Sequence, residues 1–360
     1  MEVQILEPSY KQGPLLREFY GRVYRADHPL TNEEFLVWWL HKNPFYRGEG
    51  FSCKIAVVDG QIIGHYGYLP VSVVSGDVRY QAVWGCNLVV DERYRGQGIA
   101  SLLVDGITED MDMGVDIGAS PVGEKILVKR GWVHLGSLTR YAGVLDFRGS
   151  RPLIPETLFT EQAPVEIPHF GNSPLVSVKK ISGFGEAHNL FWDRGCKNLG
   201  CTATDRTARF LNWRYTNHPL FRYWLYEARS GSELLGFAVM RLERVSEYEV
   251  YVARIVEFFC FGEARFPLLA RLVSDARVHG AVLIDFFCAF REYDDLFNRF
   301  GFFGPPTSDQ CARLFNPFVP VKHPISFNVC NRKKKLNEAF GSSATHWYVT
   351  SGDSDQDRPN

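Results

Sequence analysis

The stretch that decides the fold is VWGCNLVVDERYRGQGIASLL, which covers residues 83–103. Its apolar run ends at Val90, and a second apolar pattern, with helical spacing, begins at Ile99. Between them lie Gly96 and Gly98, which can turn consecutive backbone N–H groups toward one point. The dipole of the following helix adds positive potential at the same point. The stretch therefore predicts a strand, a phosphate-binding loop and a helix, and hence a phosphate-bearing cofactor.

The spacing of the glycines excludes two common nucleotide-binding loops. A dinucleotide site requires GxGxxG and a P-loop requires GxxxxGK[ST], and neither pattern stands here. The sequence has RxxGxG instead, formed by Arg93, Gly96 and Gly98. In this context the motif resembles the pyrophosphate loop of the Gcn5-related N-acetyltransferases, the GNAT superfamily. Further along the chain, Gly131-Trp132 resembles the Gly-aromatic turn that closes the acetyl-coenzyme A fold of that family.

The resemblance implies which residues would bind acetyl-coenzyme A. Backbone groups of Leu88, Val89 and Val90 would hold the pantetheine arm. The diphosphate would be surrounded by residues of the loop and of the first helical turn, namely Arg93, Arg95, Gly96, Gln97, Gly98, Ile99 and Ala100.

Composition limits the class of protein. The 360 residues, 45% of them hydrophobic, are enough for about two domains of ordinary size. A formal charge of −1 gives no reason to expect nucleic acid or an anionic membrane as a partner. Eight cysteines lack CxxC spacing, and no His/Cys cluster has the spacing of a zinc site. No apolar run approaches 18 residues and no signal peptide is evident, so we expect a soluble cytoplasmic protein with neither metal nor membrane span.

The first 150 residues read as two helices, antiparallel strands, the glycine loop and further alternating elements. The expected elements are helices at 14–24 and 31–42, strands at 52–58, 61–68, 71–75 and 78–84, a helix from 99 to about 113, a strand at 116–120, a helix at 125–130 and two strands within 133–147. This order is similar to the beginning of a GNAT domain.

The second half of the chain contains an internal repeat of the first. FLVWWLHKNPFYR at 35–47 aligns without gaps on FLNWRYTNHPLFR at 210–222, at an offset of 175. The shared residues are Phe, Leu, Trp, Pro and Arg, and the repetition of Trp38 at Trp213 favours a packing role for both indoles. We therefore expect an α/β protein with a mixed sheet, built from two tandem GNAT-like domains.

The expected organisation has four parts. They are an acetyl-coenzyme A-binding GNAT domain at 1–150, a proline-rich linker at 151–174, a degenerate GNAT-like domain at 175–325 and a carboxyl-terminal tail at 326–360 that would reach the acceptor site if it folds back. The second copy is called degenerate because its loop reads GEARFP at 262–267, without RxxGxG. Since a carboxylate there would repel a diphosphate, one cofactor site is expected.

A GNAT-type reaction requires a base for the acceptor ammonium and often an acid for the departing thiolate. Many members of the family place a tyrosine four residues before the Gly-aromatic turn, but here that position is Leu127. The acid and the base are therefore sought elsewhere, among histidines that titrate near neutral pH, hydroxyl groups and a carboxylate of the tail. The candidates are His65, His134, Tyr141 and Asp355, with Tyr66, Tyr68 and Ser120 as further hydroxyl groups.

The resemblance implies an N-acetyltransferase that acts on a small amine. Tandem chains of this kind resemble bacterial enzymes of amino-sugar or surface-polysaccharide pathways, so the acceptor would be a nucleotide-linked amino sugar whose diphosphate meets Arg332 and Arg358. Two alternatives stay open. One is an acyl or aminoacyl transferase of the mycothiol-synthase or peptidoglycan-bridge type, and the other is a non-catalytic acyl-coenzyme A sensor.

Overall fold

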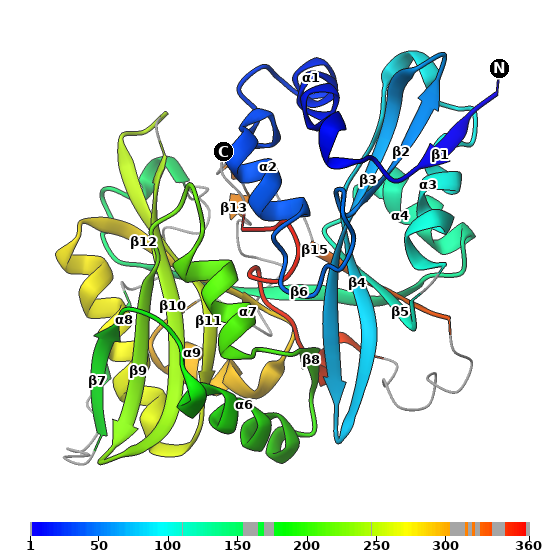
Figure 1. Cartoon of the computed structure of the whole chain (residues 1–360). Coiled ribbons are helices and arrows are strands. Elements are labelled where there is room, and N and C mark those ends of the chain that lie inside the picture. Colours follow the sequence, from blue (N-terminus) through cyan, green and yellow to red (C-terminus); the bar gives the residue numbers. More distant parts are fainter. Residues whose placement is uncertain are drawn as a thin grey trace.

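The computed structural model describes residues 2–109, 111–153, 165–168, 176–245, 247–302, 314–315, 319–320, 325–332 and 343–357. Its elements fall into two halves along the sequence, which lie mainly on the right and left sides of Figure 1, although β8 and β15 of the second half lie with the strands of the first. The first half contains β1 (Gln4–Leu6), α1 (Gly13–Val23), α2 (Glu33–Leu40), β2 (Cys53–Val58), β3 (Gln61–Ser75), β4 (Val78–Val90), α3 (Ile99–Thr108), β5 (Met113–Ile117), α4 (Pro121–Lys129) and β6 (Val133–Val144).

The second half begins after the linker, of which only 151–153 and 165–168 are described. It contains β7 (Val176–Ile181), α6 (Glu186–Leu199), β8 (Thr202–Thr204), α7 (Ala208–Leu211), β9 (Trp224–Ser230), β10 (Glu233–Val245), β11 (Val250–Cys260), α8 (Arg265–Val278), β12 (Ala281–Cys288), α9 (Asp294–Arg299), β13 (Leu314–Phe315), β14 (Val319–Pro320), β15 (Ile325–Asn331) and β16 (Trp347–Tyr348).

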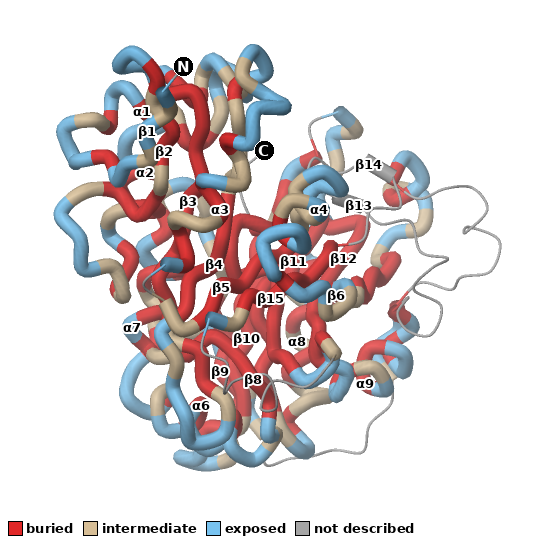
Figure 2. The backbone as a smooth tube through the Cα atoms, turned by 90° about the vertical axis from the view of Figure 1, so that its right-hand side faces the viewer, coloured by how far each residue is buried: buried red, intermediate tan, exposed pale blue. Residues whose placement is uncertain are grey.

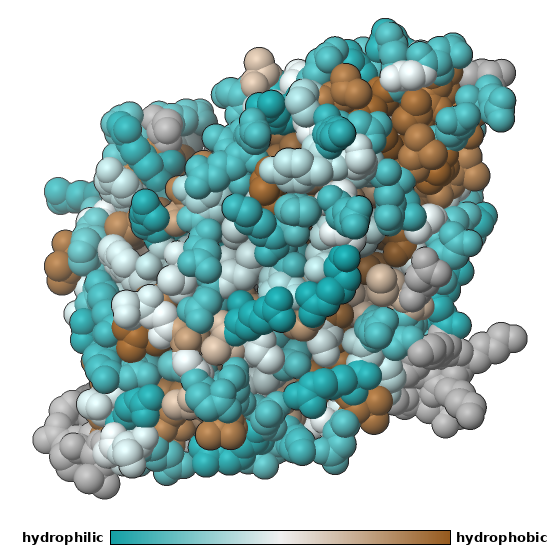
Figure 3. All heavy atoms as spheres, viewed as in Figure 1, coloured by the Kyte–Doolittle hydropathy of each residue, from teal (hydrophilic) through white to brown (hydrophobic). Residues whose placement is uncertain are grey.

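One continuous mixed sheet runs through both halves, in the order β1-β2-β3-β4-β5-β15-β6-β12-β11-β10-β9-β7. The expected mixed α/β fold is therefore confirmed. Figure 2 shows β5 and β15 as buried strands in the middle of the molecule, with many of the exposed residues in loops and on outer helix faces. The view in Figure 3 is largely hydrophilic, with one hydrophobic group at the upper right, where β1, β2 and β3 lie.

Local sequence explains the first helices. The helix α1 has a proline in its first turn and buries Leu16, Phe19 and Tyr20, which share one face by their spacing. The helix α2 begins after Asn32, whose side-chain oxygen accepts a hydrogen bond from Phe35 N at 3.0 Å. The sequence analysis, which began this helix at residue 31, was wrong by one residue at its cap.

The strand β3 is one element where two were expected. The sequence analysis predicts separate strands at 61–68 and 71–75, and Pro70, which cannot donate to a strand ladder, lies between them. On the side where Tyr68 N bonds to Ser52 O, β2 ends opposite Gly67 and β8 begins only opposite Val73. Backbone N–H groups two residues apart point the same way, so the missing donor of Pro70 faces this gap. The strand therefore continues through the proline.

The strand β6 differs most from expectation, because it is one long strand where a final pair was expected. Its first part pairs with β15, and its second part pairs with β12 of the other half, from Thr139 opposite Cys288 to Val144 opposite Leu283. Residues 325–331 are therefore an internal strand of the sheet, not the beginning of a tail. The helix α3 also ends earlier than expected, at Thr108, because β5 begins at Met113.

The two repeated segments meet face to face. Trp38 Nε1 donates to Trp213 O at 3.1 Å, and Trp213 Nε1 donates to Trp38 O at 3.2 Å. Their rings stack with centroids 5.1 Å apart, and both residues are buried. Such a reciprocal contact between equivalent residues indicates an approximate twofold relation between the copies. The packing role expected for both indoles agrees with this contact.

Candidate active site

The glycine loop has the conformation that its sequence predicts. Gly96 and Gly98 have φ angles of 79° and 81°, in the left-handed region that favours glycine. A Cβ atom at either position would meet no atom within 4 Å, so the backbone conformation, not crowding, is what requires glycine. Gly98 precedes α3, whose first N–H groups have no acceptor within the helix. The expected strand, loop and helix are present, and the loop can receive an anion.

Two arginines of the loop form hydrogen bonds to the residues that precede it. Arg93 donates to both oxygens of Asp91, at 3.0 and 2.8 Å, and these bonds help hold the pKa of that carboxyl at about 2. Arg95 Nε donates to Val90 O at 3.1 Å. Both guanidinium groups therefore fix the turn that leads from β4 into the loop.

A bulge in β4 lies just before the residues expected to bind pantetheine. Asn87 has a φ angle of 56°, and the pairing of β3 with β4 shifts register between His65 and Gly67. Beyond the bulge, the half-buried residues 88–90 continue to the loop. A bulge re-aims the backbone groups that follow it, which would serve a ligand lying along the end of β4.

A cavity of about 230 Å³ opens where β4 and β5 diverge. The two parallel strands pair only as far as Trp84 and Val115, and beyond this point they separate. The residues that line the cavity include Tyr66, Gly85, Cys86, Asn87, Leu88, Asp116, Ile117, Ser120, Leu127, Asp355 and Gln356. The position where the family often has a tyrosine thus faces the cavity as Leu127, without a hydroxyl group.

The carboxyl-terminal segment bridges the two diverging strands. Ser354 Oγ donates to Gly85 O on β4 at 2.9 Å, and Gln356 Nε2 donates to Ile117 O on β5 at 3.1 Å. Asp355, between them, lines the cavity as the sequence reading required of a tail that folds back. In Figure 1 this red segment runs between the two halves of the molecule.

Buried arginines of the second half hold this segment in place. Asp353 pairs with Arg206 at 2.5 Å, and Asp357 pairs with Arg241 at 2.8 Å. All four side chains are at most 1% exposed. Breaking a buried ion pair leaves an uncompensated charge, so these contacts strongly favour one position of the segment.

Asp116 is the group that sequence reading missed. Its carboxyl lies in the cavity wall, accepts a hydrogen bond from Tyr66 Oη at 3.3 Å, and has a pKa raised to about 7 by burial and by the nearby Asp355. Gly85 makes the contact with Tyr66 possible, because a Cβ there would lie 2.1 Å from the hydroxyl oxygen. An aspartate inside the apolar stretch Val115-Asp116-Ile117 was the available signal.

The other three candidates lie elsewhere. His65 is buried, its Nδ1 lies 3.0 Å from Asn87 O, and burial lowers its pKa to about 4. His134 on β6 contacts Glu124 Oε1 at 3.2 Å, and Tyr141 donates to Asp294 in the second half. None of these three is among the residues that line the cavity, whereas Asp355 and Asp116 line it together.

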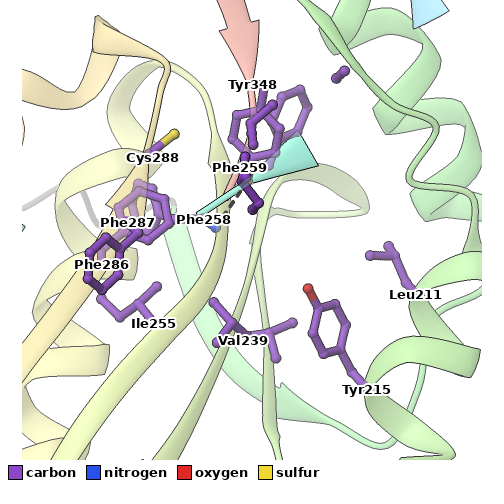
Figure 4. Close-up of a cluster of buried hydrophobic side chains, with 14 of the residues drawn as sticks. Leu211, Tyr215, Val239, Ile255, Phe258, Phe259, Phe286, Phe287, Cys288 and Tyr348 are labelled. Atoms are coloured by element: carbon purple, nitrogen blue, oxygen red, sulfur yellow. Dashed lines mark hydrogen bonds between the residues drawn. The ribbon is translucent and has the colours of Figure 1, made fainter. Parts of the chain in front are cut away.

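In the second half, aromatic side chains fill the corresponding divergence of β11 and β12. These strands pair as far as Ile255 and Phe286. Beyond that point Tyr348 packs against Phe259, and its hydroxyl accepts from Phe258 N at 3.2 Å, as Figure 4 shows. The space that holds a cavity in the first half is occupied by a hydrophobic cluster here.

The remaining expectations concern Arg332 and Arg358, a metal site and a membrane-spanning helix. Arg332 donates to Thr108 Oγ1 at 3.0 and 2.6 Å, at the end of α3, and does not line the cavity. Arg358 lies outside the described residues. Within the described part of the chain, no cluster of His, Cys, Asp and Glu could hold a metal ion. Among the same residues, no helix has both the length and the apolar character needed to cross a membrane.

Comparisons with known proteins find similarity in the first half of the chain. Residues 14–112 match the model of the acetyltransferase (GNAT) family, whereas no curated protein matches the chain significantly. The fold resembles a GCN5-related N-acetyltransferase from Anabaena variabilis, with 11% identity and a TM-score of 0.62 over 91% of this chain and 72% of that one. A GCN5-related N-acetyltransferase from Kribbella flavida gives 14% identity and a TM-score of 0.59, covering 91% of this chain and 70% of the other.

The same fold extends to a eukaryotic enzyme. N-myristoyltransferase of Saccharomyces cerevisiae, solved with bound myristoyl-CoA, is 11% identical with a TM-score of 0.55 over 97% of this chain and 84% of that one. Acetyltransferases of the GNAT family use acetyl-coenzyme A. The strand, the RxxGxG loop and the helix that the sequence predicts all lie within residues 14–112, the segment that matches the acetyltransferase (GNAT) family model.

Proposed function

We propose that the protein is an acetyl-coenzyme A-dependent N-acetyltransferase in which an amine attacks the thioester directly. The observation that carries the proposal is the carboxyl pair Asp116 and Asp355 in a cavity lined by residues 85–88 of β4, the strand that leads into the glycine loop. Backbone groups of residues 88–90 would hold the pantetheine arm, and the loop would hold the diphosphate. The acetyl group would then lie between β4 and β5.

The carboxyl pair supplies the proton acceptor. A group with a pKa near 7 is well matched to general base catalysis at neutral pH, and burial with a like charge beside it gives Asp116 that value. The amine nitrogen loses a proton to Asp116 and forms the C–N bond, while the C–S bond breaks and coenzyme A leaves as a thiolate. Tyr66 lines the cavity with its hydroxyl hydrogen-bonded to Asp116, so it is the proposed group that passes a proton to that thiolate while it takes back the proton that Asp116 received from the amine.

The charge of the cavity favours a cationic acceptor. Its described lining holds two carboxyl groups and no lysine or arginine, which attracts an ammonium group and repels a phosphate at the same depth. A nucleotide-linked amino sugar, as used in surface-polysaccharide pathways, would have to keep its diphosphate outside. Arg332 no longer supports that acceptor. The described cysteines are free and buried, which supports a reducing, cytoplasmic compartment.

Cofactor binding is tested by thermal shift. Gly98→Glu places a carboxylate and a strained side chain in the loop, so acetyl-coenzyme A should stabilise the wild type and not this variant. Gly262→Glu is the matched control, because Gly262 occupies the corresponding loop of the second half, also has a positive φ of 54° and also faces open space. Equal stabilisation of Gly98→Glu and the wild type would refute the cofactor site.

Turnover is tested by thiol release from acetyl-coenzyme A with polyamines, amino sugars, nucleotide-linked amino sugars, amino acids and cysteinyl glycosides. We expect Asp116→Asn to lower kcat about 100-fold or more while leaving acetyl-coenzyme A affinity unchanged. Activity confined to cysteinyl glycosides would favour the mycothiol-synthase alternative. Tight donor binding without turnover of any amine would favour the acyl-coenzyme A sensor.

A further inference from the structure

Polar side chains form a row across the strands of the first half, at the level of the cavity. Tyr66 lies on β3 and reaches across Gly85 of β4 to Asp116 on β5. The next strand, β15, carries Asn328 directly opposite Asp116, and β6 carries His134 directly opposite Asn328. The row thus leads from the cavity, through a buried amide, to a histidine whose side chain is 40% exposed.

Two buried atoms in this row lack a hydrogen-bond partner among the described residues. They are Asp116 Oδ1 and Asn328 Nδ2, one acceptor and one donor, on residues that are 7% and 0% exposed. Side chains of directly opposite residues in an antiparallel pair have Cβ atoms about 5 Å apart. An unsatisfied buried polar group is costly, and a short side-chain movement or one bridging water would satisfy both atoms.

His134 fixes the direction in which the amide of Asn328 points. The His134 Nδ1 atom lies 3.3 Å from Asn328 Oδ1 and 3.2 Å from Glu124 Oε1 of α4. With its oxygen held on the β6 side, Asn328 presents its NH₂ group to β5. His134, which the sequence analysis proposed as a base, therefore lies outside the cavity and is separated from Asp116 by Asn328.

We propose that Asn328 is a positioning residue for Asp116, that its Nδ2 donates to Asp116 Oδ1, and that His134 holds it in that orientation. The proposal rests on the proposed function, in which Asp116 is the base. Donation to the ionised carboxyl lowers its pKa, and so opposes the effects of burial and of the acidic neighbours. The groups that face Asp116 are Asp355 from the carboxyl-terminal segment, Tyr66 from β3, Cys86 from β4 and Glu124 from α4.

The test measures the pKa of Asp116 without any acceptor substrate. Full-length protein labelled with ¹³C at the aspartate carboxyls is titrated by NMR, and Asp116→Asn identifies the signal. In Asn328→Leu the carboxyl loses its donor, so its pKa should rise by about one pH unit. The matched control is Cys330→Ala, two residues along the same face of β15, equally buried and outside the row. It should leave the pKa of Asp116 unchanged.

A second pair of variants keeps the test decisive if Asn328→Leu does not fold. His134→Leu removes the group that orients the amide and should raise the pKa of Asp116 by a smaller amount. His134→Gln retains a donor for Asn328 Oδ1 and should restore the wild-type value. An unchanged Asp116 pKa in folded Asn328→Leu, or identical values in both His134 variants, would overturn the proposal. Full turnover by Asp116→Asn would instead overturn the proposed base, which keeps the two failures distinct.

Discussion

Replacing Asp357 by asparagine tests how much the buried ion pair of the carboxyl-terminal segment contributes to the free energy of unfolding. Asp357 is 1% exposed, pairs with Arg241 at 2.8 Å and accepts from Tyr223 Oη at 2.7 Å. The substitution keeps the shape and the oxygen that Tyr223 needs, and it removes the charge. Arg241 then lies beside a neutral amide and keeps Glu243 as its remaining acidic partner.

The magnitude follows from the pKa of Asp357. Although burial alone would raise it, the nearby guanidinium groups, Arg241 first among them, lower it from 3.8 to about 2. That difference corresponds to an expected loss of about 2.5 kcal/mol, and nothing further is added because Arg241 keeps its ion pair with Glu243. Because the folded pKa is depressed, this stabilisation is complete above about pH 4 and is lost as the pH falls toward 2.

The assay is urea unfolding at pH 7, with Asp193→Asn as the control. Asp193 also pairs with an arginine, Arg79, at 2.8 Å, but its side chain is 52% exposed. Exposed pairs contribute about 0–1 kcal/mol, so the control should change the free energy of unfolding little. Asp357→Asn should also lower turnover, because Asp355 is no longer held in the cavity, without weakening the binding of acetyl-coenzyme A. Equal, small losses of stability in both variants would show that the buried pair does not anchor the segment.

Two further predictions concern stability. Since burial lowers the pKa of His65 to about 4 against 6.5 for an ordinary histidine, its neutral form stabilises the fold above pH 6.5, and about 3 kcal/mol is lost as the pH falls to 4. In His65→Gln, the free energy of unfolding measured with urea should fall by about 3 kcal/mol less than in the wild type between pH 6.5 and 4. An unchanged pH dependence would show that other groups cause it. Trp38→Phe and Trp213→Phe should each cost about 1–3 kcal/mol, by leaving a buried carbonyl unpaired. Because the indoles also stack, the double variant should depart from additivity by about 0.5 kcal/mol or more, whereas strict additivity would contradict a reciprocal contact.

The features that sequence reading found are encoded locally. The positive φ angles of Gly96 and Gly98 can be predicted from the residue type alone. The strand and the helix beside them can be predicted from the spacing of apolar residues within about ten positions. The repeat was visible because Trp38 and Trp213 stand at a constant offset in matching surroundings. Both features needed no knowledge of which distant segments pair.

The features that it missed depend on pairings between remote segments. Asp116 becomes a cavity residue only because β4 and β5 diverge after Val115, and Asn328 becomes its neighbour only because β15 inserts beside β5. No local pattern specifies that insertion. Likewise, the sequence around Arg206 and Arg241 gives no sign that they are buried. Their burial depends on ion pairs with Asp353 and Asp357, which lie more than 100 residues further along the chain.

The insertion of β15 between β5 and β6 has a consequence for biosynthesis. The glycine loop leaves the ribosome more than two hundred residues before Asn328 and Asp355, so a nascent chain can display a donor-binding surface long before its carboxyl pair exists. Contacts of such long sequence separation form late and slowly. Under the proposed function, a product arrested before residue 325 would bind the acyl donor without consuming it, because Asn328 and Asp355 would be missing.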